Sequence, residues 1–445
     1  MPKRLALRVI VLALGLVLAS AWASPAQELM SRAADLLVRN YAGPSAKNPN
    51  ELVQKYLNKL NEACAPQGEA CSVDVAVPLL RDMVNELGDR HSRLWLPEEY
   101  AGMGLVPGDQ QTRRGLGVRH AVVPELPGLV ILEVEDGSPA KAAGLRRGDR
   151  IVKINGQELS GSADERRAVL SKAIAEGGEI SLAVARAPFD ALIALRVTPG
   201  TLGTPLPELY LLEGGIAWLR IPNFRADQTA QEVHRLVREA QSKGAWGLVL
   251  DMRNNGGGSL FQVILTAGAF VDGPGRRYER RSLLTDTVLY RGGTLLRRDG
   301  SSERPLLSLP APARWQGPMV VLVNKSSASG AEFCALDLQS AGIPVIGEET
   351  VGVGDTVTNF FVLQRGGPAL QITTSIARRL DGSAYPSKVT PDRAVADDAK
   401  ALAQGHDEPL EAALGLLQDR RQAWQAGLDA AAPPDLQKDA FMRAW

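Results

Sequence analysis

The chain has 445 residues, enough for two or three domains with separate hydrophobic cores. Its 50 lysines and arginines balance 50 aspartates and glutamates, so the net charge gives no electrostatic reason to expect nucleic-acid binding. With only four histidines and no H-E-x-x-H pattern, we expect neither a metal site nor a cofactor.

The N-terminus has the pattern of a secretory signal peptide. Basic residues precede an apolar run at 9–19, and Ala21-Trp22-Ala23 supplies a small-x-small cleavage site. An uncleaved membrane anchor is the alternative, but the run is shorter than the ~20 residues that span a bilayer. We predict cleavage after Ala23 and export to the periplasm, the cell envelope or the medium. No later segment is a candidate membrane span.

Helical periodicity follows this leader. Apolar residues recur at three- and four-residue intervals, which predicts a small helical domain. Its expected helices cover residues 28–39, 49–63 and 77–87.

Three cysteines occur in the chain. Cys64 and Cys71 flank a turn-rich loop, and in an exported protein we expect them to form a disulfide that stabilises the fold by roughly 2–3 kcal/mol. Cys334 has no evident mate, and we expect it to be a small buried hydrophobe rather than a nucleophile.

The next stretch resembles a PDZ domain. It opens with Gly115-Leu116-Gly117-Val118 and continues with G-S-P-A-x-x-A-G-L and G-D-x-I-x-x-I-N-G. A PDZ domain binds an extended peptide by strand addition, and the resemblance implies that the amides of this opening loop receive a terminal carboxylate. A phosphate cradle is the weaker alternative, because no G-x-G-x-x-G follows.

From about residue 200, strands and helices alternate, which predicts an α/β core with a largely parallel sheet. Three polar or glycine-rich motifs follow predicted strands, at the edge where ligands of such sheets bind. They are D-M-R-N-N-G-G-G at 251–258, N-K-S-S-A-S-G-A-E at 324–332 and G-E-E-T-V-G-V-G at 347–354.

The middle motif has two interpretations. Ser329 lies where a strand turns into a helix, so its hydroxyl has helix N-terminal amides beside it, as a nucleophile requires. Consecutive glycines in the first motif are able to aim N–H groups at a developing oxyanion. Alternatively, Ser329 with Glu332 three residues later forms an ordinary capping box.

In this order, the three motifs resemble those of the carboxy-terminal-processing (tail-specific) protease family of serine peptidases. That family carries D-L-R-x-N-x-G-G, S-A-S-x-x-E and G-E-x-T-x-G-K-G after a PDZ domain. The resemblance implies that Ser329 is the nucleophile, that the amides of Gly257 and Gly330 form the oxyanion hole, and that Glu332 supports the site. Which glycine of 256–258 donates stays open.

The third motif departs from the family pattern. Val353 stands where the family carries its lysine base, and a valine cannot accept a proton. His91 lies in a segment similar to the family's L-D-x-H-S-x-Y-L-x-P-E-E-Y, and a histidine from a related segment is the base in the tricorn-like branch. Three alternatives follow: His91 is the base, another lysine such as Lys388 replaces the missing one, or hydrolysis has been lost.

We therefore expect an α/β multidomain protein that acts as a serine endopeptidase on unfolded or tail-exposed proteins. The alternative is an inactive peptide-binding or scaffold protein of the same fold. Residues 408–420 and 435–445 look like exposed helices, to which we assign no chemistry. The expected parts are a signal peptide (1–23), a helical domain (24–104), a PDZ domain (112–190), the peptidase core (200–400) and C-terminal helices (401–445).

Overall fold

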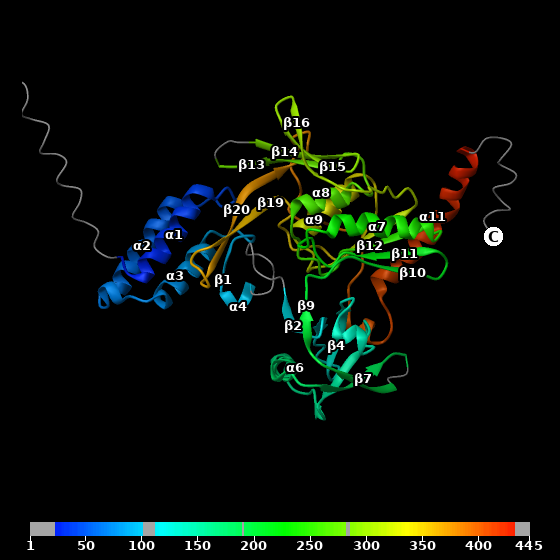
Figure 1. Cartoon of the computed structure of the whole chain (residues 1–445), viewed down its shortest axis with the longest axis horizontal. Helices are drawn as coiled ribbons and strands as arrows, with labels where there is room; N and C mark the ends of the chain where they lie inside the picture. The colour runs from blue at the N-terminus through cyan, green and yellow to red at the C-terminus, as the bar shows by residue number, and fades with distance from the viewer. Residues whose placement is uncertain (1–22, 101–111, 189–190, 282–284, 432–445) are drawn as a thin grey trace, which may run out of the picture. The chain divides into compact units, whose positions relative to one another are not determined.

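The structure is a computed structural model that describes residues 23–100, 112–188, 191–281 and 285–431 (Figure 1). The predicted signal peptide up to residue 22 lies outside the described residues, as does the helix expected at 435–445. The chain divides into two compact units. The first comprises Met1–Glu99, Arg280–Ser282 and Thr358–Ser375, and the second comprises Tyr100–Glu279, Leu283–Val357 and Ile376–Trp445.

Three amphipathic helices form the core of the first unit: α1 (Pro25–Asn40), α2 (Pro49–Cys64) and α3 (Val73–Glu86). Each helix buries the apolar face that its periodicity predicts, against the other two. After α2 comes a short 3₁₀ helix, η1 (Gly68–Ala70), and a disulfide joins Cys64 to Cys71 across it. The covalent link holds the end of α2 close to the start of α3.

A distant part of the chain completes this helical core. Strand β1 (Arg93–Trp95) pairs antiparallel with the first residues of β20 (Ala369–Arg378). Leu370 and Ile372 of β20 are buried among the helices. Strand β19 (Thr356–Val362) pairs with β20, and α4 (Pro97–Tyr100) is a single turn after β1.

The PDZ region is a sheet with strand order β3-β4-β5-β7-β8, in which β6 pairs with β5. Strand β3 therefore forms one edge, where strand addition would occur. Helix α6 begins at a capping box between Ser162 and Glu165. The elements are β2 (Arg113–Gly115), β3 (Val118–Ala121), β4 (Leu129–Val134), α5 (Pro139–Ala142), β5 (Arg150–Ile154), β6 (Gln157–Glu158), α6 (Ala163–Glu176), β7 (Ile180–Arg186), β8 (Ala191–Val197) and β9 (Gly200–Leu202).

The α/β core is built on a sheet of order β10-β11-β12-β17-β18-β21. Only the β10–β11 pair is antiparallel, which confirms the predicted largely parallel sheet. The strands are β10 (Glu208–Leu212), β11 (Ile216–Arg220), β12 (Gly247–Asp251), β17 (Met319–Val323), β18 (Val345–Gly347) and β21 (Arg393–Ala394).

Helices cover both faces of this sheet, because successive strand residues point to opposite sides. In β17, Val321 and Val323 pack with α7 (Thr229–Ser242), α8 (Leu260–Ala267) and α9 (Gly330–Ser340). Val320 and Leu322 of the same strand pack with α11 (Glu408–Ala431). The short α10 (Ala399–Ala403) precedes α11.

The prediction of an exposed C-terminal helix is wrong for α11. Its residues Ala413 and Leu417 are 0% exposed, and they lie in the cluster that covers β12, β17 and β18. Amphipathic periodicity in α11 is weak enough that the sequence does not reveal its buried face, whereas packing against the sheet does.

A meander completes the second unit. It consists of β13 (Gly275–Glu279), β14 (Thr285–Arg291), β15 (Thr294–Asp299) and β16 (Ser302–Ser308), with β13 also pairing with the end of β20. Its buried side chains join the cluster around α8 and α9. Within the described ranges, no helix has both the length and the apolar character needed to cross a membrane.

Candidate active site

The loops after β12 and β17 are locked to each other, because parallel neighbouring strands end at the same edge of the sheet. The Asn254 amide donates to Oδ1 of Asn324 at 2.9 Å, and Nδ2 of Asn324 donates to Oδ1 of Asn254 at 3.1 Å. The Ala328 amide donates to the Asn255 carbonyl at 2.9 Å. The first and second sequence motifs therefore form one connected structure.

Ser329 has a strained backbone at the start of α9. Its φ and ψ are 53° and −112°, whereas an N-cap residue normally has an extended conformation. For a residue with a Cβ atom, such a conformation costs about 1–3 kcal/mol and persists only where the surroundings impose it. A sharp strand-to-helix turn of this kind presents a serine hydroxyl outward in the nucleophile elbows of hydrolases.

Glu332 holds the loop after β18 against Ser329. Its Oε2 accepts hydrogen bonds from the amides of Ser329 at 2.8 Å and Val353 at 3.0 Å. Its Oε1 accepts from the Thr350 hydroxyl at 2.5 Å and the Gly352 amide at 2.7 Å. Burial raises the pKa of Glu332, and these donors oppose the rise. With both oxygens occupied, Glu332 links the start of α9 to the loop after β18.

The glycine run lies directly against the serine. A Cβ atom added to Gly257 would lie 2.9 Å from the Ser329 Cβ and 2.7 Å from the Gly330 nitrogen. Only glycine fits there, and its φ of 89° also favours glycine. The Gly257 amide donates to Oδ1 of Asn255 at 2.8 Å, while among the described residues the Gly258 amide has no acceptor. The structure thus offers a second glycine amide beside the predicted one.

The two predicted replacements for the lysine base lie in different settings. Nζ of Lys388 lies 2.6 Å from Oε2 of Glu349, so this exposed lysine is already engaged in an ion pair. His91 lies in the first unit, between α3 and β1, where its amide donates to Oδ1 of Asp89 at 3.0 Å. Val353 is 5% exposed, an aliphatic side chain in the core.

His234 is not a candidate base. It lies on α7, where Nδ1 accepts from the Ala313 amide at 2.8 Å and Nε2 is 2.9 Å from the Leu265 carbonyl oxygen. Burial lowers the pKa of His234. Both ring nitrogens have backbone partners, so this neutral imidazole has a structural role.

The predicted peptide-binding loop lies between β2 and β3. The Leu116 carbonyl accepts from the Ala140 amide at 2.9 Å, and the Gly117 carbonyl accepts from the Glu135 amide at 2.8 Å. Within the described part of the chain, the amides of Leu116 and Gly117 have no acceptor. The loop therefore has N–H groups available for a carboxylate beside the edge strand β3.

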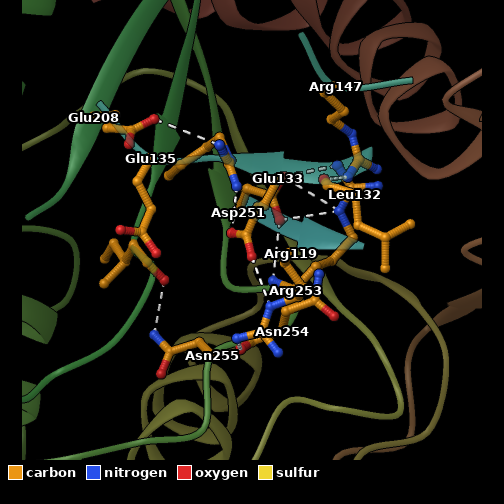
Figure 2. A network of polar contacts seen from close by, with 12 residues as sticks. Arg119, Leu132, Glu133, Glu135, Arg147, Glu208, Asp251, Arg253, Asn254 and Asn255 are labelled. Atoms are coloured by element: carbon orange, nitrogen blue, oxygen red, sulfur yellow. Dashed lines mark hydrogen bonds and ion pairs between the residues drawn. The ribbon is translucent and has the colours of Figure 1, made fainter. Parts of the chain in front are cut away.

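A buried ionic network, which the sequence did not reveal, connects the PDZ region with the core (Figure 2). Arg253, whose side chain is 2% exposed, binds Asp251 at 2.7 Å, Asp407 at 2.6 Å and Asp397 at 3.1 Å. Arg147 of the PDZ region binds Asp407 at 2.9 Å. Burial alone would raise the pKa of Asp407, but the charges of Arg253 and Arg147 lower it. The network fixes the backbone that leads from β12 to the glycine run.

A second link joins the same two parts. Arg220 of β11 forms ion pairs with Glu133 of β4 and Glu208 of β10. Arg119 of β3 binds Glu133 at 3.0 Å, and its guanidinium donates to the Asn254 carbonyl at 3.4 Å. No sequence spacing signals these contacts, because their members lie in separate motifs.

Among the described residues, no group of three or more histidine, cysteine, aspartate or glutamate side chains could hold a metal ion. The site itself brings together the Ser329 hydroxyl, the amides of the glycine run and the buried Glu332 carboxylate.

Comparisons with known proteins agree with this arrangement. The family model of peptidase family S41 matches residues 215–395, and that of the PDZ domain matches residues 106–185. A carboxyl-terminal-processing protease of Picosynechococcus sp. is 29% identical over 297 residues, which cover 66% of each chain. Carboxy-terminal processing protease CtpA of Bacillus subtilis is 30% identical over 233 residues, 52% of this chain and 45% of that protein.

These matches span between 45% and 66% of the two curated relatives. Among solved structures, an S41 protease from Bacteroides fragilis has a similar fold, with a TM-score of 0.57 at 16% identity over 87% of this chain and 97% of the other. The ordered motifs, the parallel sheet and the PDZ sheet all agree with these matches. The chain therefore carries a PDZ domain followed by a region similar to the S41 peptidases, and over that part of its length it resembles the carboxyl-terminal-processing proteases.

Proposed function

We propose that the protein is an exported serine endopeptidase of the carboxyl-terminal-processing type, with Ser329 as its nucleophile. The observation that best supports this proposal is the strained backbone of Ser329, which lies in close contact with Gly257 at the start of α9. A helix cap does not need this conformation, whereas an outward-facing nucleophile does. The predicted signal peptide supports export.

In the proposed reaction, Oγ of Ser329 attacks the carbonyl carbon of the scissile peptide bond while a base takes the hydroxyl proton. The negative charge that develops on the carbonyl oxygen is stabilised by the Gly330 amide and by one amide of the glycine run. That amide is Gly258, or Gly257 once Asn255 releases it. The leaving amine takes the proton, and water then hydrolyses the ester on Ser329.

We propose His91 as the base. Its support is the G-D-R-H-S segment and the chemistry of an imidazole, which accepts a proton near neutral pH. Lys388 is the alternative, and its pairing with Glu349 weighs against it.

The PDZ region is proposed to present the C-termini of unfolded or tail-exposed proteins. Support comes from the edge strand β3 and from the amides of Leu116 and Gly117 beside it. Full-length Ser329→Ala protein should bind peptides with a free, apolar C-terminus more tightly than their amidated forms. Equal affinities for the two forms would contradict the role in reading C-termini.

An inactive peptide-binding protein is the second candidate function, and the buried Val353 at the position of the family lysine favours it. A fluorophosphonate probe separates the two, because covalent capture requires an activated hydroxyl. Labelling of the mature chain that is lost in Ser329→Ala supports the peptidase. If the wild type is not labelled and Val353→Lys is, the chain has lost only its base.

A further inference from the structure

A cavity of about 650 Å³ lies between the edge strand of the PDZ region and the loops around Ser329. Val118 and Arg119 of β3 form one side. Asn254, Gly256 and Ser326, from the first two sequence motifs, form the other. A peptide added to β3 would therefore have this cavity beside it on the side of the catalytic loops.

The cavity wall carries one more arginine than its glutamates can pair. Arg113 forms an ion pair with Glu135, and Arg119 pairs with Glu133 at 3.0 Å. Arg225 also lines the cavity, and no carboxylate of the described residues pairs with it. Burial, with a smaller effect from the charge of Arg119, lowers the pKa of Arg225. A partly desolvated guanidinium without a partner is a ready binding group for an anion.

The backbone holds Arg225 close to the catalytic loop. The amide of Phe224 donates to the Gly257 carbonyl at 2.9 Å, and the Ser259 amide donates to the Phe224 carbonyl at 2.8 Å. The Arg225 amide itself donates to Oδ1 of Asn223 at 2.8 Å. One guanidinium nitrogen of Arg225 lies 3.9 Å from the position that a Cβ atom on Gly256 would occupy. Arg225 is thus fixed next to the glycine run rather than held on a free loop.

We propose that Arg225 is a specificity-determining residue that binds an aspartate or glutamate side chain of the substrate. This acidic residue lies between the substrate's C-terminal end, which the PDZ region binds, and the peptide bond that is cleaved. This inference rests on the proposed peptide-binding function. A carboxylate matches the planar guanidinium and its N–H groups. The terminal carboxylate of the substrate is the other source of the same chemistry, but the loop at Gly115-Leu116-Gly117-Val118 already offers amides for it.

The test uses the full-length Ser329→Ala chain, so that binding is measured without cleavage. Fluorescent peptides with one apolar C-terminus carry a single glutamate at successive positions, each matched by a peptide with glutamine there. At one position or two neighbouring ones, glutamate should bind about tenfold more tightly than glutamine. Arg225→Gln should remove this preference, and Arg225→Lys should retain part of it.

Arg39→Gln is the matched control, because Arg39 is an exposed arginine of α1 that forms an ion pair with the exposed Asp35 on its own helix. It should leave the preference unchanged, and thermal melting should show that each variant is folded. Equal affinity for glutamate and glutamine peptides at every position overturns the proposal, as does a preference that survives in Arg225→Gln. If Arg225→Gln weakens only peptides with a free C-terminus, wherever glutamate stands, the bound carboxylate is terminal and the proposal is wrong.

The proposed function fails in a different way. If no peptide binds and the fluorophosphonate probe labels nothing, both the peptidase and the peptide-binding alternatives fall, and the role of Arg225 falls with them. If peptides bind without discrimination while Ser329 is labelled, only the role of Arg225 is overturned.

Discussion

Two helices of the second unit begin with the same S-x-x-E pattern, and their environments differ. At α6, Ser162 has φ and ψ of −65° and 164°, and its hydroxyl accepts from the Glu165 amide at 3.3 Å. At α9, Ser329 has φ and ψ of 53° and −112°. Glu165 is exposed, whereas Glu332 is fully buried and accepts four hydrogen bonds. At α6 the pattern forms an ordinary helix cap, whereas at α9 it holds Ser329 in a backbone conformation of high energy.

The difference arises outside the pattern itself. Ser162 follows Gly161 in an exposed turn, so packing does not prevent the N-cap residue from adopting its preferred extended conformation. Ser329 is confined by Gly257 on one side and, through Glu332, by the loop from Thr350 to Val353 on the other. The same sequence pattern therefore forms an unstrained cap where it is exposed and a strained turn where distant loops confine it.

The largest effect is expected from Ser329→Ala, which should abolish fluorophosphonate labelling and casein cleavage. Removing the nucleophile of a serine peptidase typically costs on the order of 10⁶-fold in kcat. Ser162→Ala is the matched control, since it removes the hydroxyl of the same pattern and should leave activity unchanged. Comparable losses in the two variants would show that the conformation of Ser329 is unrelated to catalysis.

His91→Ala should reduce cleavage nearly as much as Ser329→Ala, if His91 takes the proton, because members of a catalytic unit are not additive. Activity of the wild type should then rise with pH, since only the neutral imidazole accepts a proton, and the reference pKa of an imidazole is ~6.5. The measurement is the pH profile of kcat/KM. Full activity of His91→Ala beside an inert Ser329→Ala would make His91 structural and Lys388→Met the next variant to assay.

Glu332→Gln should lower kcat by roughly a hundredfold. The carboxylate accepts hydrogen bonds with two oxygens, whereas the side-chain amide of glutamine has only one acceptor oxygen. Its NH₂ group would face the amides and the hydroxyl that now donate to Glu332. Loss of these buried bonds should also cost about 3 kcal/mol in the free energy of unfolding. Glu165→Gln, at the exposed capping box of α6, should change neither kcat nor the free energy of unfolding. Casein assays measure the first quantity and urea titration measures the second.

The smallest effects concern stability, and they should have opposite signs at the two serines. Ser162→Ala removes a cap and should lower the free energy of unfolding by about 1 kcal/mol. Ser329→Gly relieves a positive φ and should raise it by about 1 kcal/mol while removing activity. Thermal melts of both variants check this, and a destabilised Ser329→Gly would mean that the turn is not strained.

Much of the fold follows from local sequence. The periodicity of α1 to α3, the glycine signatures of the PDZ region and the alternation around β12 and β17 predict the observed classes of structure, because these signals act over a few residues. Ser329, Glu332 and the glycine run were found in the same way, by short motifs after strands. Their catalytic roles stay predictions, to be tested as above.

Other features depend on contacts between residues far apart in the chain. Arg253 and Asp407 form an ion pair although 154 residues separate them in the sequence. The buried face of α11 is defined only by its packing on the sheet. Leu370 completes a core that helices from the other end of the chain build. Neither spacing nor propensity encodes such pairs. Sequence alone placed a serine at a helix start; tertiary contacts imposed its positive φ, because strain at one residue persists only when packing from other segments compensates for it.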